Sequence, residues 1–152
     1  MPKFSEKKVV GYTARQLYDL VLDVEKYPEF VPWCKDCEVL ERKMGHIIAD
    51  MMVKFSFFEK SYRSLIKHGI KEEKYFIEVE QISGPFEKLN TSWEFIKVDK
   101  LYTDISFTID FEFKSKIIDN LVSSMFHSAA KEMIKAFERR ADIVYDKNKR
   151  SS

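Results

Sequence analysis

The hydrophobic pattern of the chain changes from a strand period to a long helical period after residue 113, and this change limits the folds that the chain can adopt. From Leu101 to Phe113 apolar and polar residues alternate. The apolar ones share one face of a strand: Ile105, Phe107, Ile109, Phe111 and Phe113. Beyond them the apolar residues recur at helical spacing: Ile118, Leu121, Val122, Met125, Ala129, Met133, Ala136, Phe137, Ala141 and Val144. The pattern predicts a long strand with one solvated face, then a helix of about eight turns with Ser115 as its N-cap.

The residues before this strand contain further strand patterns joined by short connections. The predicted strands are residues 4–10, 38–43, 47–55, 61–68, 75–82 and 90–98. A capping box at Thr13 and Gln16 predicts a short amphipathic helix that ends near Asp23. Turns are expected at Gly45, at Gly69 and the charged residues after it, and at residues 83–85.

This order of elements predicts an α+β fold in which a curved antiparallel sheet of about six to seven strands wraps the long C-terminal helix. We expect one domain over residues 1–147 and a polar tail over residues 148–152. The amphipathic helix is the large apolar element available to fill the concave side of the sheet. A cavity between helix and sheet is therefore expected, and small apolar ligands bind in such places.

The predicted ligand site combines an aromatic segment with the inward faces of the sheet and the helix. Between Tyr27 and Cys34 the chain is too apolar for a solvated loop, while Pro28 and Pro32 prevent a long helix there. This segment would form the mouth of the cavity. The predicted ligand-binding residues are Phe30, Val31, Trp33, Met51, Val53, Phe55, Phe86, Trp93, Phe107, Ile109, Phe111, Met125, Ala129 and Met133. Methionine suits an adaptable pocket, with plain core packing as the alternative for each one.

Residue patterns typical of catalysis and metal binding are weak in this sequence. Cys34 and Cys37 have the spacing of a W-C-x-x-C redox motif, but a strand pattern follows them where a helix would be needed to lower a thiol pKa. His46, His68 and His127 stand alone, without metal-ligand spacing. Inward-facing strand positions carry almost no carboxylates, which general acid–base catalysis would require. We therefore predict two ordinary thiols, no catalytic residues, no metal and no cofactor.

Charge and hydropathy favour a cytoplasmic protein that is at most peripheral to the inner membrane. The chain has 26 Lys and Arg residues against 25 Asp and Glu residues, and this balance neither requires nor excludes a nucleic-acid partner. No apolar run approaches the ~18 residues of a membrane span, and residues 1–10 have a strand pattern and not that of a signal peptide.

The C-terminal helix and tail carry a basic outer face: Lys131, Lys135, Arg139, Arg140, Lys147, Lys149 and Arg150. These cations are interpreted as complements of the helix dipole, with a patch for anionic lipid or RNA as the alternative.

Several local motifs converge on one family. They are residues 16–21, the run Tyr-Pro-x-Phe-x-Pro-Trp-Cys at residues 27–34, Gly-Pro-Phe at 84–86 with Leu89, Trp-Glu-Phe at 93–95, and residues 137–141. From about residue 2 to residue 145 the chain resembles the coenzyme Q-binding START-domain proteins of the polyketide-cyclase-like superfamily, a group that includes the bacterial ribosome-association toxin. It departs from the family pattern at Cys37, where Ser is common, and at residues 90–92, where a Gly is common.

The resemblance implies a helix-grip fold and a role in handling ubiquinone or a similar isoprenoid quinone for respiration. Three functions stay open at this point. The first is non-enzymatic binding of a quinone or other lipid. The second is binding to the large ribosomal subunit so that subunit joining is blocked. The third is an enzyme similar to the aromatase/cyclases, because one fold supports several activities.

Overall fold

The structure, a computed structural model, describes residues 3–55 and 58–145, except for the side chain of Phe55. The elements are β1 (Lys3–Val10), α1 (Ala14–Leu22), the 3-10 helix η1 (Val24–Glu29), β2 (Cys34–Lys43), β3 (His46–Phe55), β4 (Phe58–Lys71), β5 (Lys74–Ser83), β6 (Phe86–Lys97), β7 (Thr103–Phe113), α2 (Lys116–Ser123) and α3 (Phe126–Tyr145). The predicted polar tail over residues 148–152 lies outside the described residues.

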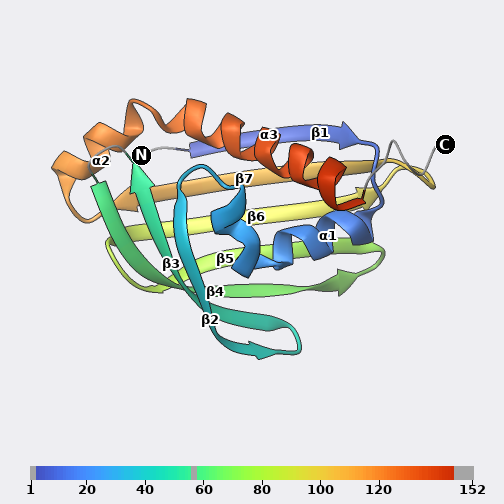
Figure 1. The fold of residues 1–152 in the computed structure, drawn as a ribbon, viewed down its shortest axis with the longest axis horizontal. Coiled ribbons are helices and arrows are strands. Elements are labelled where there is room, and N and C mark those ends of the chain that lie inside the picture. Colours follow the sequence, from blue (N-terminus) through green and yellow to red (C-terminus); the bar gives the residue numbers. More distant parts are fainter. Residues whose placement is uncertain (1–2, 56–57, 146–152) are drawn as a thin grey trace.

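The described strands form one curved antiparallel sheet in the order β1-β7-β6-β5-β4-β3-β2. Figure 1 shows the helices gathered on one side of this sheet, with α3 running across it near β1 and β7. The α+β fold predicted from the sequence, a curved sheet that wraps a long C-terminal helix, is confirmed. Among the helices of the described chain, none combines the length and apolarity needed to cross a membrane.

The start of α1 confirms the predicted capping box. The Thr13 hydroxyl accepts a hydrogen bond from the Gln16 N–H at 3.1 Å, and the Gln16 side-chain oxygen accepts one from the Thr13 N–H at 2.9 Å. Two backbone donors that the first helical turn leaves without partners are thereby satisfied. The helix ends at Leu22, with Asp23 as its C-cap, where the sequence predicted the end.

The C-terminal helix is broken, where the sequence predicted one continuous helix. Ser115 caps α2 as expected, by accepting a hydrogen bond from the Ile118 N–H. Near the break, the Ser124 hydroxyl donates to the Leu121 carbonyl at 2.8 Å, and the Met125 N–H donates to the carbonyl three residues earlier at 3.1 Å. A serine hydroxyl that donates to a helix carbonyl competes with the backbone N–H groups for that acceptor. A hydrogen bond to the carbonyl three residues earlier is of the 3-10 type and interrupts the regular α-helical hydrogen bonds. The apolar period of the sequence continues across this break and so conceals it.

The turn predicted at Gly69 and the charged residues after it is confirmed for the charged residues and wrong for Gly69, because β4 continues through Gly69 to Lys71. Gly69 pairs with Phe76 of β5, and a Cβ atom at residue 69 would lie only 3.1 Å from the Phe76 ring. Glycine is therefore needed at residue 69 because the Phe76 ring lies so close, and not because the chain turns there. The turn lies at Glu72 and Glu73, which both have positive φ angles.

Candidate functional site

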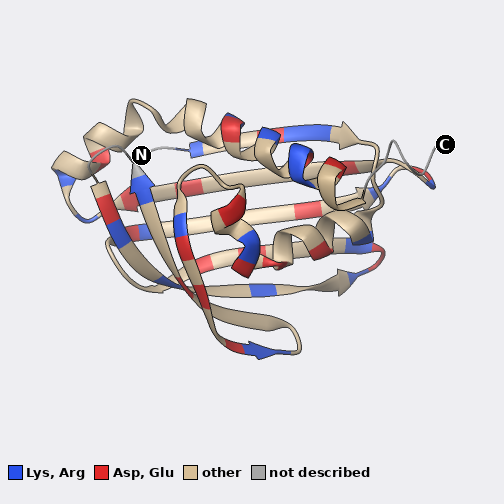
Figure 2. Cartoon of the chain, viewed as in Figure 1, with Lys and Arg blue, Asp and Glu red and all other residues tan. Residues whose placement is uncertain are grey.

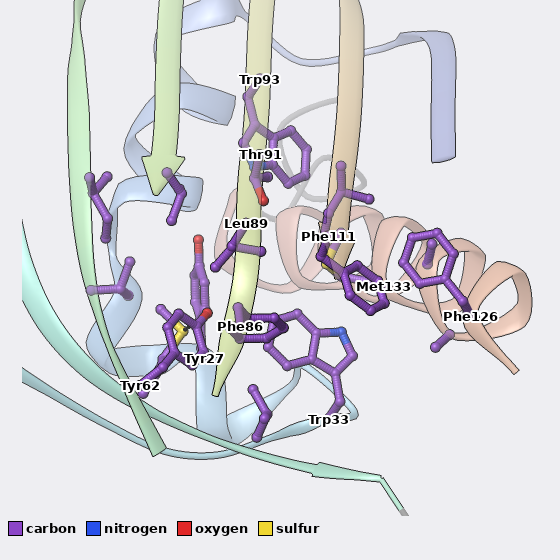
Figure 3. Close-up of a pocket in the computed structure, with 18 of the residues that line it drawn as sticks. Tyr27, Trp33, Tyr62, Phe86, Leu89, Thr91, Trp93, Phe111, Phe126 and Met133 are labelled. Carbon is purple, nitrogen blue, oxygen red and sulfur yellow. Dashed lines mark hydrogen bonds between the residues drawn. The ribbon is translucent and has the colours of Figure 1, made fainter. Parts of the chain in front are cut away.

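An apolar cavity of about 110 Å³ lies between the concave face of the sheet, the α1–η1 segment and the α2–α3 helices. Figure 3 shows the lining side chains converging from the strands and from α3. They are Val21, Val24, Tyr27, Trp33, Met51, Val53, Tyr62, Ile66, Ile77, Val79, Phe86, Leu89, Thr91, Trp93, Ile109, Phe111, Phe113, Val122, Phe126, Ala129, Ala130, Met133 and Phe137. A concave, mostly apolar site with a few polar groups is typical of small-molecule binding.

The strands and α3 contribute to the lining through their periodicity. On β7, Ile109 and Phe111 lie two residues apart and so point to the same side of the sheet. On α3, Ala129, Met133 and Phe137 lie four residues apart and share one helix face. The small side chain of Ala129 leaves space where a larger residue would reach the sheet, and this helps to keep the cavity open.

Most of the residues that the sequence predicted as ligand-binding are brought together here. Those that line the cavity are Trp33, Met51, Val53, Phe86, Trp93, Ile109, Phe111, Ala129 and Met133. Phe55 belongs to β3, but its side chain lies outside the described part of the structure. That the lining residues contact a ligand stays a prediction.

The remaining predicted residues do not line this cavity. Phe30 packs against Phe137 with ring centroids 5.1 Å apart, and the Arg140 guanidinium lies over the Phe30 ring, 5.1 Å from its centroid. Val31 is buried away from the cavity. Phe107 shares the inward face of β7 but lies beyond Trp93, against a second cavity. Met125 is 37% exposed, because the break between α2 and α3 turns it toward solvent.

Sequence reasoning missed the polar groups of the lining. The Tyr27 hydroxyl donates to the Val21 carbonyl, and the Tyr62 hydroxyl donates to Met51 Sδ at 3.4 Å. Burial raises the pKa of both tyrosines, so each hydroxyl remains protonated at neutral pH. Figure 3 also shows the Thr91 side chain among the residues that surround the cavity. The apolar Tyr27–Cys34 run signalled Tyr27, and the alternation of Tyr62 with Ile66 along β4 could have indicated Tyr62.

The chemistry of this lining favours binding over acid–base catalysis. Among the described residues that line the cavity, none is Asp, Glu, His, Lys, Arg or Cys. A histidine paired with a tyrosine could act in acid–base catalysis, and the Tyr18 hydroxyl lies 2.7 Å from His68 Nδ1. Neither of these two residues lines the cavity. In the described part of the chain, no group of three or more His, Cys, Asp or Glu residues is placed to hold a metal ion.

The W-C-x-x-C segment forms the start of β2 and not the start of a helix. Cys34 and Cys37 are both free. Burial raises the pKa of each thiol from 9.0 to about 12, whereas a reactive thiolate needs a lowered pKa. Cys34 is buried and Cys37 is partly buried, and this environment is that of ordinary thiols, in line with the interpretation drawn from the sequence.

A second cavity of about 230 Å³ lies between β1, β7, α1 and the C-terminal half of α3. Val21, Trp93 and Phe137 line both cavities and separate them. Its floor is apolar, but its rim is charged: Lys8 donates to Glu138. The first cavity has no such charged rim among its described lining residues.

The comparisons with known proteins agree with this architecture. The family described as "Polyketide cyclase / dehydrase and lipid transport" matches residues 10–138. The ribosome association toxin RatA of Rickettsia prowazekii (strain Madrid E) is 34% identical over 145 residues, which cover 95% of this chain and 99% of RatA. The mitochondrial coenzyme Q-binding protein COQ10 homolog B of Xenopus laevis is 34% identical over 152 residues, which cover 94% of this chain and 59% of that protein.

A solved structure shares the fold at low sequence identity. A START superfamily protein from Mycobacterium smegmatis superposes with a TM-score of 0.79 at 19% identity, over 93% of this chain and 98% of that one. At this identity the likeness shows the fold alone.

Proposed function

Because the chain belongs to the polyketide cyclase / dehydrase and lipid transport family, we propose that it binds a hydrophobic ligand, most of all an isoprenoid quinone such as ubiquinone, without catalysing a reaction. One observation carries this proposal: the cavity between sheet and α3 is lined by apolar and aromatic side chains with only a few hydroxyl and indole groups. Such a site gains affinity from burial, which is worth about 0.8 kcal/mol per CH₂ group.

The dimensions of the cavity suit a ring or a short apolar chain. An engineered apolar cavity of about 150 Å³ in another protein holds benzene. The cavity here is of similar size, at about 110 Å³, and Trp33, Phe86 and Phe111 supply aromatic walls on which a quinone ring would pack. A longer tail needs more space and would extend past Phe137 into the second cavity or out beside α2.

The Tyr62 hydroxyl is the group best placed to orient a quinone ring. It is buried and donates to the sulfur of Met51 at 3.4 Å. A thioether sulfur is a weak acceptor. A quinone carbonyl would accept a stronger hydrogen bond from the same hydroxyl, so binding would exchange a poor partner for a better one.

The experiment that tests this proposal is solvent extraction of the purified protein, followed by mass spectrometry of the molecules that co-purify. A stoichiometric isoprenoid quinone would support the proposal. Titration with a short-chain quinone follows, with tryptophan fluorescence as the signal, because both tryptophans of the chain line the cavity. An empty extract together with no change in fluorescence on titration would overturn it.

A second candidate function is association with the ribosome, and the similarity to RatA over 95% of the chain favours it. This function would use the outer surface instead of the cavity. Lys131, Lys135 and Arg139 are exposed and lie four residues apart on α3, where they form a basic stripe. Lys147, Lys149 and Arg150 lie outside the described residues. Arg140 is not part of the stripe, because it donates to Glu29 at 2.9 Å.

Co-sedimentation with isolated large ribosomal subunits separates the two candidates. Binding through the basic stripe should fall steeply as the salt concentration rises, since neutralising phosphates releases counterions. Replacing Lys131, Lys135 and Arg139 by Glu should abolish it and leave quinone binding intact. A cyclase-type enzyme ranks third, because the described lining residues include no carboxylate or histidine and burial keeps the hydroxyls of Tyr27 and Tyr62 protonated. We further propose that the protein works in the cytoplasm, at most peripheral to the inner membrane.

A further inference from the structure

Helix α2 is apolar on two opposite faces. On its inner face Val122 is only 2% exposed and lines the first cavity. On its outer face Ile117 is 74% exposed and Leu121 is 40% exposed, and Met125 continues the line at 37%. Ile117 and Leu121 lie four positions apart and therefore form one stripe along α2, and Met125 follows them in the break before α3. Exposed apolar side chains that lie close together along the chain in this way are candidates for a site of interaction.

Exposed lysines lie before and after this apolar stripe, and the carboxylate of Glu132, beside the last of them, lies 4.0 Å from the Lys135 ammonium. Lys114 and Lys116 precede it, and Lys131 follows it on α3; all three are exposed. Asp119 lies in the same segment, but its carboxylate turns back and accepts a hydrogen bond from the Phe113 N–H at 3.0 Å. Figure 2 shows basic positions at the start of α2, at one end of the molecule. An apolar strip flanked by lysines is the composition that suits the interface of an anionic membrane.

The stripe and the wall of the cavity belong to the same segment of chain. Val122 of α2, together with Phe126 and Ala129 of α3, lines the cavity from the inner side. The interruption at residues 124–125 separates α2 from α3, so α2 is a short element joined to the rest by a break. A shift of α2 would open the cavity directly toward any surface on which its outer face rests.

We propose that the outer face of α2 docks on an anionic lipid bilayer and that the hydrophobic ligand passes between bilayer and cavity beside α2. The second half of this statement rests on the proposed function; the docking itself does not. A ribosomal surface fits less well, because RNA is contacted mainly through cations and hydrogen bonds, whereas the centre of this patch is Ile117, Leu121 and Met125.

Sedimentation with phospholipid vesicles tests the docking. The vesicles are phosphatidylcholine alone, or phosphatidylcholine mixed with phosphatidylglycerol. Wild-type protein should bind the mixed vesicles, and Ile117→Glu/Leu121→Glu should bind them at least about tenfold more weakly, because charged groups are expelled from the apolar interface. The milder pair Ile117→Ser/Leu121→Ser should also bind more weakly, and it covers the case in which the glutamate pair does not fold.

The matched control is Leu101→Glu/Ile143→Glu. These residues are 66% and 71% exposed, and neither lies on α2. The control adds the same charge as the test pair, and it should keep wild-type vesicle binding. Equal losses in both pairs, or no binding of wild-type protein to the mixed vesicles, would overturn the docking proposal. So would loss of ribosome co-sedimentation in the α2 pair with vesicle binding unchanged.

Binding of a short-chain, water-soluble quinone is measured on the same variants in the absence of vesicles. The α2 pair should retain this binding, because Ile117 and Leu121 do not line the cavity. Vesicle binding without quinone binding in wild-type protein would contradict the proposed function and leave the docking in place. Quinone binding without vesicle binding would contradict the docking and leave the proposed function in place.

Discussion

The rings of Trp93 on β6 and Phe137 on α3 meet edge to face, with centroids 5.3 Å apart and planes at 70°. Both residues line both cavities, so this contact divides the space between sheet and helix into two parts. It also joins the centre of the sheet to the middle of α3. The length of ligand that the protein holds therefore depends on whether this contact stays closed.

Phe137→Ala should join the two cavities. Loss of the buried ring should lower the free energy of unfolding by about 3–5 kcal/mol, a cost measurable by urea denaturation. The enlarged space should raise affinity for long-tailed quinones relative to short-tailed ones, because more of the tail becomes buried. Fluorescence titration with a short-tailed and a long-tailed quinone measures this preference.

Phe30→Ala is the matched control for Phe137→Ala. Its ring packs against Phe137 at 5.1 Å but lines neither cavity. This variant should lose stability without changing the preference for tail length. If Phe137→Ala kept the wild-type preference while remaining folded, the two cavities would not act as parts of one site.

Ala129→Trp should fill the first cavity. An indole at this position of α3 would occupy the space in which we expect the ligand to lie. Affinity for a quinone should fall at least about tenfold, with a modest overpacking cost of about 1–3 kcal/mol in stability. Isothermal titration measures the affinity, and circular dichroism checks the fold. Ser128→Trp, on the exposed side of the same helix, should bind normally. Undiminished binding by a folded Ala129→Trp protein would place the ligand elsewhere.

Much of the fold could be predicted from the sequence, because local patterns decided it. The alternation before Phe113, the capping box at Thr13 and the helical period afterwards all lie in contiguous residues. The family resemblance drawn from the motifs is confirmed by the match over residues 10–138. The break after α2 and the straight passage of β4 through Gly69 depend instead on side-chain hydrogen bonds and a cross-strand ring. Neither the break nor the continuation of β4 changes the spacing of the apolar residues in the sequence.

The candidate site was predictable only in part for a similar reason. Periodicity tells which face of a strand a residue occupies but not how far across the sheet it lies. Ile109 and Phe107 share one face of β7, yet they line different cavities on either side of Trp93. Met125 fits the helical period, but the local break turns it outward. The position of Tyr62 depends on the pairing of β4 with β3, which only the assembled sheet provides.

Tyr62→Phe should separate two contributions to ligand affinity, the hydrogen bond that orients the ligand and the burial of its apolar surface. Among the described residues the hydroxyl has only a sulfur acceptor, so its removal should change stability by less than about 1 kcal/mol. A quinone should bind about two- to tenfold more weakly, because its carbonyl loses a donor, while a hydrocarbon of similar size should bind equally well. Titrations with both ligands measure the difference. An equal effect on both ligands would contradict a hydrogen bond from Tyr62.

The stability of the protein should fall in alkaline solution, partly through Cys34. Burial raises its pKa from 9.0 to about 12 in the folded state, whereas the thiol of the unfolded chain ionises near 9.0. A raised folded pKa means that the neutral thiol stabilises the fold fully below pH 9.0 and that this contribution declines as the pH rises toward about 12. Each such thiol lowers the free energy of unfolding by about 1.4 kcal/mol per pH unit in that interval.

The test compares wild-type protein with Cys34→Ala by urea denaturation at about pH 8 and about pH 10. Both should lose stability, since Cys37 also has a raised pKa. The loss in Cys34→Ala should be smaller by about 1.4 kcal/mol, because the remaining titrating groups are common to both proteins. The same pH dependence in the two proteins would show that the Cys34 thiol ionises freely in the folded state. That result would reopen the redox interpretation of the W-C-x-x-C segment, which depends on an accessible thiolate.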